Sequence, residues 1–156
     1  MARAHSYQMH LTWSGAAAGS TESYEKYSRE YRIEIEGKAP FVGSADPLFR
    51  GDKSLLNPEE LLLAALSSCH MLSYLAYAAR RGVVVMGYED AASGTMVLEG
   101  GGGHFTEVVL RPRVTVRAGS DEALALRLHD DAHRDCFIAS SVNFAVRYEG
   151  AVTAGR

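Results

Sequence analysis

The feature that most limits how this chain can fold is an uncharged stretch of nineteen residues, from Leu61 to Ala79. Asn57 can cap a helix start, a proline follows at the first helical position, and Glu60 completes a capping-box-like pattern. At the other end, two arginines and a glycine occupy positions 80–82, which is typical of a helix end. The sequence therefore predicts one helix over residues 58–81, roughly 36 Å long.

A helix that is apolar on every face must be surrounded by other apolar groups. Nineteen residues are close to the minimum for a membrane span, so a membrane helix is one interpretation. Serines, a histidine and two tyrosines dilute the stretch, and apolar strand faces elsewhere in the chain need a packing partner. We therefore predict the core helix of a globular protein that does not enter a membrane, with a second subunit completing its cover.

The rest of the chain alternates between strand patterns and loops. Apolar residues recur with a period of two, or in short runs, in six segments that we expect to be strands: 7–13, 31–35, 83–86, 95–99, 107–117 and 142–148. Residues 37–53 are expected to form an irregular loop, and Gly100 to Gly103 a hairpin loop. Pro112 indicates an edge strand or a bulge. Ser120 is expected to cap a second helix over residues 121–134, so the chain is predicted to be α+β.

Composition narrows the class of protein further. A chain of 156 residues with 47% hydrophobic and 22% charged residues is expected to form a single globular domain over residues 1–156. The net charge of -3 offers no broad basic face for nucleic acid. No secretory signal is visible at the N-terminus, so a cytoplasmic location is expected.

The chain contains two cysteines, Cys69 and Cys136. In a reducing compartment they can be inert buried residues, metal ligands or redox-active groups. Cys69 lies in the middle of the long predicted helix, where a small buried hydrophobic residue is the ordinary interpretation. Cys136 follows the second helix, where free backbone N–H groups could favour a thiolate.

A metal site has to be weighed against redox chemistry. His129 and His133 are four residues apart, so they share one face of a helix, which is the spacing of zinc-binding histidine pairs. Cys136 follows three residues later, and Cys69 and His70 could approach from the other helix. The glutamate of an H-E-x-x-H arrangement is missing, so no metal site and no cofactor are predicted.

The segments around these cysteines resemble the signature of the OsmC/Ohr family of thiol peroxidases. Within that family they resemble the OsmC-like branch most. The resemblance covers nearly the whole chain and rests on these segments: Asn57-Pro58-Glu59-Glu60-Leu61-Leu62, Ala64-Ala65, Ser67-Ser68-Cys69, Trp13, Phe49-Arg50-Gly51-Asp52 and Asp135-Cys136. The distance from the Asn-Pro-Glu motif to the first cysteine, with a second cysteine 67 positions further on, is the most specific part.

The resemblance implies a cysteine-based peroxidase that reduces organic hydroperoxides, and hydrogen peroxide as a further substrate. Cys69 would be the peroxidatic thiolate and Cys136 the resolving thiol of a disulfide cycle. Arg50 would stabilise the thiolate and orient the peroxide, while Glu59 would hold the arginine. Arg29 and Arg32 remain alternatives for the role of Arg50.

The same resemblance implies a fold and partners. The fold would be an intertwined homodimer, with antiparallel sheets wrapped around long buried central helices. A dithiol of the lipoyl type or a small thiol would reduce the disulfide. Phe49, Met71, Tyr74 and Phe137 could line an apolar approach to Cys69, although all four can equally be core residues. The alternative function is a non-catalytic small-molecule or metal-binding protein on the same fold.

Overall fold

The computed structural model describes residues 4–155 and divides into two compact units, one ending at Leu61 and the other beginning at Leu62. It contains both sheets and helices, which confirms the α+β class. Helix α1 (Pro58–Arg80) runs through the boundary between the units. The single domain predicted over residues 1–156 therefore stays a prediction.

The first unit is built on a small antiparallel sheet of three strands, β1 (His10–Thr12), β2 (Tyr31–Glu34) and β3 (Phe41–Gly43). Strand β2 lies in the centre, with Leu11 opposite Ile33 and Ile33 opposite Phe41. Strand β3 falls inside the predicted irregular loop 37–53, so that prediction was wrong at these positions. Alternation is not visible over three residues, and the strand is recognised only by its pairing with β2.

This first unit buries almost no apolar side chain of its own. Its buried residues among those described are glycines and polar residues: Gly15, Gly43, Ser44 and Asn57. Leu11, whose alternation suggested a half-buried strand, is 52% exposed. A sheet of three short strands needs a hydrophobic face packed on another element to be stable, so apolar cover for this unit has to come from elsewhere.

Helix α1 begins and ends where the sequence predicts. The backbone N–H of Glu60 donates to Asn57 Oδ1 at 2.8 Å, and the Glu60 carboxylate accepts from the Asn57 N–H at 3.1 Å, which is a capping box. At the C-terminus, Gly82 takes a left-handed φ of 72° and the Val83 N–H donates to the Ala78 carbonyl at 2.9 Å. This is a Schellman arrangement, in which glycine avoids the steric cost of positive φ.

Only a narrow stripe of α1 is buried within the described residues. The stripe repeats every four positions: Leu66, His70, Tyr74 and Ala78. The opposite side is open, and Leu72 is 62% exposed. By length and composition α1 is the one helix of the described chain that could cross a membrane, a test that core helices of soluble proteins also pass. Cover by a second subunit stays a prediction.

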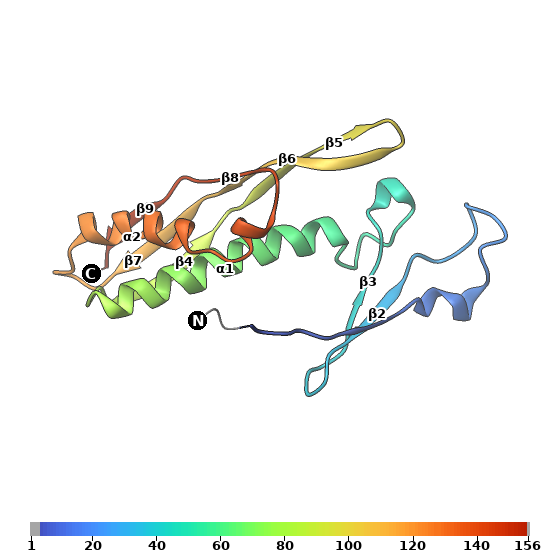
Figure 1. Ribbon diagram of the computed structural model, residues 1–156, viewed down its shortest axis with the longest axis horizontal. Coiled ribbons are helices and arrows are strands. Elements are labelled where there is room, and N and C mark those ends of the chain that lie inside the picture. The colour runs from blue at the N-terminus through green and yellow to red at the C-terminus, as the bar shows by residue number, and fades with distance from the viewer. Residues whose placement is uncertain (1–3, 156) are drawn as a thin grey trace. The chain divides into compact units, whose positions relative to one another are not determined.

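The second unit contains two sheets of three strands each (Figure 1). One has the order β4 (Val85–Asp90), β7 (Pro112–Val116), β9 (Ala151–Ala154), and the other β5 (Ser93–Glu99), β6 (Gly102–Leu110), β8 (Ala145–Tyr148). Each sheet joins one antiparallel and one parallel pair. The sheets of this unit are therefore mixed, not purely antiparallel as the resemblance implied, because β8 and β9 follow α2 (Glu122–Arg134) and pair in parallel with earlier strands.

Three local predictions in this unit were wrong. Residues 107–117 form parts of two strands, not one. Pro112 marks neither an edge strand nor a bulge: it is the first residue of β7, the central strand of its sheet, and proline is tolerated at the first residue of a strand. Asp121, not Ser120, caps α2, since its carboxylate accepts from the Leu124 N–H at 2.8 Å. The predicted hairpin loop is confirmed, but its turn is confined to Gly100 and Gly101, both with positive φ, while the next two glycines belong to β6.

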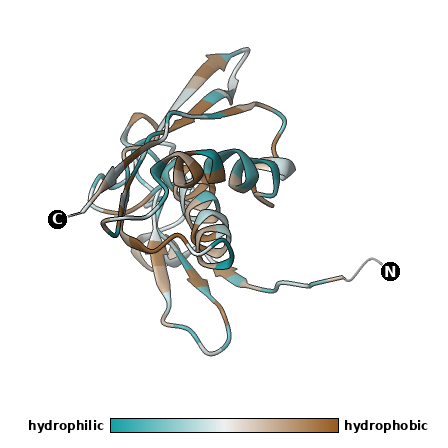
Figure 2. Cartoon of the chain, turned by 90° about the vertical axis from the view of Figure 1, so that its left-hand side faces the viewer, coloured by the Kyte–Doolittle hydropathy of each residue, from teal (hydrophilic) through white to brown (hydrophobic). Residues whose placement is uncertain are grey.

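Two hydrophobic clusters form the core of the second unit. The first packs α1 and α2 on sheet β4-β7-β9 and includes Tyr74, Val114 and Leu128. The second packs the earlier part of α1 on sheet β5-β6-β8 through Leu66 and Val108. Helix α2 mixes hydrophilic and hydrophobic positions, as its hydropathy colouring shows, and buries only one side (Figure 2).

Candidate functional site

Cys69 and Cys136 come together in the second unit although 67 residues separate them in the sequence. Cys69 is half-buried on α1, and Cys136 is buried just beyond the end of α2. Both are free cysteines, and the Cys69 thiol is near enough to contribute to the raised pKa of Cys136. The fold therefore brings the two thiols into one neighbourhood.

The surroundings of Cys136 hold it in the protonated form. Burial, with a smaller contribution from the neighbouring Cys69, raises the pKa of its thiol to about 11. Backbone N–H groups of Ala139 and Ile138 oppose the rise, as the position after a helix end suggested, but burial outweighs them. The interpretation that this position favours a thiolate was therefore wrong. At neutral pH Cys136 is a thiol, so Cys69, the less buried of the two, is the better candidate nucleophile.

A tight turn fixes the backbone on which Cys136 sits. The Ser140 N–H and the Ser140 hydroxyl both donate to the Cys136 carbonyl at 3.0 Å. A cavity of about 260 Å³ adjoins this turn and is lined by His133, Arg134, Ala139, Ser140 and Val146. The turn leaves Phe137 80% exposed. The thiol is thus held inward while the next side chain points to solvent.

Two of the three candidate arginines lie near one carboxylate in the first unit. The positive charges of Arg50 and Arg29 both contribute to lowering the pKa of Glu25, after hydrogen bonds from Ser23 and its own backbone. Arg50 is exposed, with a left-handed φ of 66° at the end of a short 3-10 helix. The guanidinium of Arg29 lies 3.7 Å from the ring centroid of Tyr27 and donates to the carbonyls of Tyr24 and Tyr27.

Arg29 and Arg32 are held differently. Arg29 lines a cavity of about 370 Å³ in the first unit, together with Trp13, Thr21, Tyr27, Tyr31, Ser44, Ala45 and Pro58. Arg32 instead forms an exposed ion pair with Glu34 on the same strand, at 3.0 Å. Arg29 therefore faces a cavity, whereas Arg32 is engaged in an ion pair.

Glu59 lies in the first turn of α1, ten residues before Cys69 on the same helix. Its charge contributes to raising the pKa of Tyr31, after burial of that phenol. Among the described residues its Oε2 atom is buried and has no hydrogen-bond partner. A buried carboxylate oxygen without a donor is costly, and a guanidinium is the group that would satisfy it best.

The four predicted substrate contacts differ in accessibility. Phe49 is 38% exposed in the first unit, Met71 is half-buried on α1, and Phe137 is open to solvent. Tyr74 is fully buried, and its hydroxyl donates to the Ala125 carbonyl at 3.0 Å. Tyr74 therefore serves the core of this chain. Contact of any of the four with a substrate stays a prediction.

The arrangement of histidines does not match the metal alternative. Within residues 4–155 no group of three or more His, Cys, Asp or Glu side chains is placed to hold a metal ion. His129 does not pair with His133 as its helical spacing suggested. It pairs with His70 on α1, through a 3.1 Å contact between His129 Nδ1 and His70 Nε2. Sequence reasoning missed this pair, because no local pattern links residues 59 positions apart.

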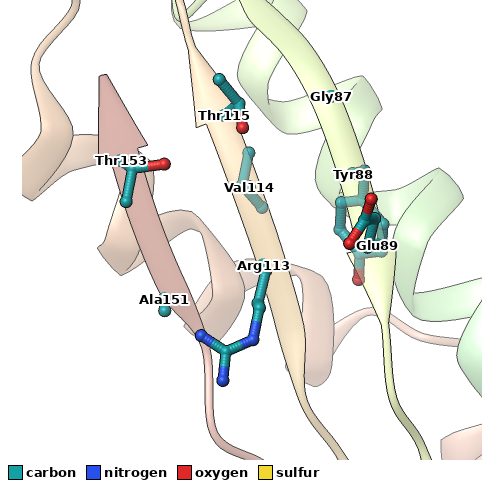
Figure 3. Close-up of a pocket in the computed structure, with 8 residues that line it drawn as sticks. All are labelled: Gly87, Tyr88, Glu89, Arg113, Val114, Thr115, Ala151 and Thr153. Carbon is teal, nitrogen blue, oxygen red and sulfur yellow. The ribbon is translucent and has the colours of Figure 1, made fainter. Parts of the chain in front are cut away.

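A third cavity, of about 410 Å³, lies on sheet β4-β7-β9 and carries no thiol (Figure 3). Its lining comes from all three strands: Gly87, Tyr88, Glu89, Arg113, Val114, Thr115, Ala151 and Thr153. Val114 and Tyr88 also pack in the first core cluster, whereas Arg113, Glu89 and Thr153 are exposed. The cavity is a depression in the polar face of a sheet, where Gly87 has no side chain to fill it.

The fold and the paired thiols define an α+β dithiol protein. A family model described as OsmC-like protein matches residues 51–149, and the chain belongs to this OsmC-like family. The match spans both cysteines and the Asn-Pro-Glu segment. The family predicted from these motifs is therefore confirmed.

Solved structures agree with this assignment. An OsmC-like protein of unknown function from Vibrio cholerae is 32% identical, with a TM-score of 0.85, and the match covers 94% of this chain and 99% of the other. An organic hydroperoxide resistance protein from Elizabethkingia anophelis is 18% identical, with a TM-score of 0.66 and coverage of 97% and 99%. An organic hydroperoxide resistance protein, OsmC, from Legionella pneumophila is 16% identical, with a TM-score of 0.64 and coverage of 94% and 97%. The last two are similar in fold. No curated protein matches the sequence.

Proposed function

We propose that this protein is a thiol-dependent peroxidase that reduces organic hydroperoxides through Cys69 and Cys136. The observation that carries the proposal is the pairing of a half-buried thiol with a buried, protonated one. Membership in the OsmC-like family, which includes proteins named for hydroperoxide resistance, supports it. Hydrogen peroxide is proposed as a further substrate, reduced by the same chemistry.

The proposed cycle has three balanced steps. The Cys69 thiolate attacks the terminal oxygen of R–O–O–H, the O–O bond breaks, and the alkoxide leaves and takes up a proton to give R–OH. Cys69 is then a sulfenic acid, and Cys136 attacks its sulfur to form the Cys69–Cys136 disulfide and release water. A dithiol reductant of the lipoyl type, or a small thiol, reduces the disulfide by exchange and becomes oxidised itself.

An arginine is proposed to stabilise the Cys69 thiolate and to orient the peroxide. Arg50 is the first candidate and Arg29 the competitor, since both lie near Glu25 and Arg29 also faces a cavity. Glu59 is proposed to hold that arginine, because its buried Oε2 has no donor among the described residues. Phe49, Met71 and Phe137 are proposed to contact the organic part of the substrate.

A second copy of this chain is the proposed partner. The open side of α1 and the apolar residues of the first unit need cover, and the chain itself supplies little of it within residues 4–155. Burial of such faces between two copies would be strongly favourable. We propose a homodimer in the cytoplasm, with no nucleic-acid partner and no membrane insertion.

The first experiment is a mass and thiol count of the reduced protein before and after one equivalent of cumene hydroperoxide. Loss of both thiols, with a Cys69–Cys136 disulfide recovered on digestion, is the expected result. Cys136→Ser should stop at a sulfenic acid that dimedone traps, and excess peroxide should then over-oxidise Cys69. Two thiols that survive unreacted would point to a non-catalytic member of the family.

The arginine is identified by comparing Arg50→Lys, Arg29→Lys and Arg32→Lys, and we expect Arg32→Lys to change the rate least because Arg32 is exposed and ion-paired with Glu34. Lysine keeps the charge but loses the bidentate fork, so the functional position should lose at least about tenfold in the rate of sulfenic acid formation. Glu59→Gln should lower the same rate. Equal rates in all four variants would refute the proposed arginine and glutamate roles and leave the thiol chemistry in place.

A further inference from the structure

A buried pair of histidines joins the helix of Cys69 to the helix that precedes Cys136. His70 and His129 are both fully buried, and their ring planes are within 3° of parallel. His70 Nε2 lies 3.1 Å from His129 Nδ1, so one of these nitrogens carries an N–H that donates a hydrogen bond to the other. The ring of Tyr74 stacks on His129, with 4.2 Å between centroids. The pair is therefore a packed, hydrogen-bonded unit.

This pair connects α1, which carries Cys69, with α2, which ends two residues before Cys136. His70 directly follows Cys69 on α1, and His129 lies on α2, seven residues before Cys136. Hydrogen bonds from Tyr74 to the Ala125 carbonyl and from Tyr77 to Asp135 join the same two helices. Of these three links, only the histidine pair joins two titratable side chains that are both fully buried.

We propose that the His70–His129 pair positions Cys136 for attack on oxidised Cys69, and that acid releases this positioning by protonating the pair. The proposal rests on the proposed peroxidase function. It assigns positioning roles to two residues that do not themselves take part in the covalent steps. Its consequence is a sulfenic acid at Cys69 that forms in acid but resolves slowly.

The surroundings of the pair explain why it has to stay neutral. Burial, with a smaller contribution from the charge of a neighbouring histidine, lowers the pKa of both His70 and His129 to about 4. Among the described residues His70 Nδ1 and His129 Nε2 are buried and have no partner. Protonation of both rings would also break the bond between them, because both facing nitrogens would then be donors.

Four other groups face the pair: Asp90 on β4, His133 and Asp130 on α2, and Tyr148 on β8. The Asp90 carboxylate already accepts from the Ser67 hydroxyl at 2.5 Å and from the Arg111 N–H at 2.6 Å. Asp130 accepts from the Tyr148 hydroxyl. Both carboxylates are therefore occupied, and neither bonds to an imidazolium in this arrangement. A protonated pair would gain by moving to solvent, and α2 with Cys136 would move with it.

Variants of His129 separate the hydrogen bond from the ring. His129→Phe keeps a ring but removes the bond, and His129→Asn retains an amide that can bond to His70. At pH 7.5, His129→Phe should slow conversion of the sulfenic acid into the disulfide by up to about tenfold, the worth of one buried hydrogen bond. His129→Asn should restore most of that rate. Formation of the sulfenic acid should change little in both.

The pH profile tests the acid release. Ionisation of Cys136 alone should lower the rate of disulfide formation by about tenfold per pH unit, because the thiolate is the nucleophile and the pKa of Cys136 is about 11. In the unmodified protein the rate should fall more steeply than this between roughly pH 6.5 and 4, the range between the free and the buried histidine pKa, where release of the protonated pair becomes favourable. The double variant His70→Phe/His129→Phe should keep only the tenfold slope, whereas His104→Phe, which changes an exposed histidine on β6, should keep the steeper fall.

Three outcomes would overturn the proposal. They are an unchanged profile in the double variant, a His129→Asn as slow as His129→Phe, or loss of helical circular dichroism in the same pH range, which would show that the pair supports the whole fold. Disulfide formation is also measured with diamide, which oxidises dithiols without peroxide. If diamide shows the predicted profile but peroxide does not react, the proposed function fails and the positioning stands. If peroxide turnover is normal but the rate of disulfide formation shows only the tenfold slope, the positioning proposal fails and the proposed function stands.

Discussion

Selective alkylation of the two thiols tests the most specific electrostatic feature of the site. Iodoacetamide reacts with thiolates, and at pH 7.5 a thiol with an ordinary pKa of about 8.5 is roughly 10% ionised. With a pKa of about 11, Cys136 is ionised only to roughly 0.03% at that pH. Ionisation alone therefore predicts alkylation of folded Cys136 about 300-fold more slowly than in the unfolded chain, and its burial slows the reaction further.

The assay is mass spectrometry of Cys136-containing peptides after timed alkylation of the reduced protein. The Cys69→Ala variant isolates Cys136, and the same variant in 8 M urea supplies the unfolded rate. In Cys69→Ala the rate should rise modestly, since the neighbouring thiol contributes to the raised pKa but burial is the larger cause. Equal rates in the folded and unfolded variant at pH 7.5 would refute the assignment of Cys136 as the buried, protonated partner.

Three further predictions concern stability, measured by urea denaturation followed by circular dichroism. Asn57→Ala should lower the free energy of unfolding by about 1 kcal/mol because α1 loses its 2.8 Å cap, whereas Asn57→Asp should keep the cap; equal values for both would contradict the capping box. Tyr74→Phe should cost about 1 kcal/mol, since the buried Ala125 carbonyl loses a donor, and no loss relative to the exposed Tyr24→Phe would count against that bond. His70 and His129 have pKa values lowered to about 4, so the unfolded chain binds more protons than the folded one between pH 4 and 6.5. The free energy of unfolding should therefore be about 2 kcal/mol lower per titrating ring at pH 5 than above pH 6.5. His104→Phe should show the same loss, and His70→Phe/His129→Phe should show none.

The elements predicted best from the sequence are those with strong local signals. Helix α1 has a capping residue, an apolar body and a glycine end, and all three signals lie within the helix or beside it. Strands β3 and β9 were not predicted, because three or four residues show no periodicity and their pairing is long-range. The division of residues 107–117 between two sheets also depends on partners that arrive only after α2.

At the thiol site, too, the features with a local sequence signal could be predicted and those that depend on packing could not. The two cysteines could be selected from the sequence because they stand in motifs that resemble a family signature, and their neighbourhood in the structure agrees with a dithiol. The partner of His129 could not be predicted, because helical spacing points to His133 and only the packing of α2 on α1 brings His70 into contact. The protonation of Cys136 likewise follows from burial, a property that no short motif encodes.

The parallel pairs β6–β8 and β7–β9 have a consequence for synthesis on the ribosome. The central strands β6 and β7 are made before α2, yet each has one partner within residues 145–154. Until those residues leave the exit tunnel, both strands present an unpaired hydrogen-bonding edge and the cluster around Val108 and Val114 cannot close. Folding of the nascent chain is therefore expected to wait until β8 and β9 have been synthesised. Translation stalled before β8 should leave a protease-sensitive, chaperone-binding intermediate.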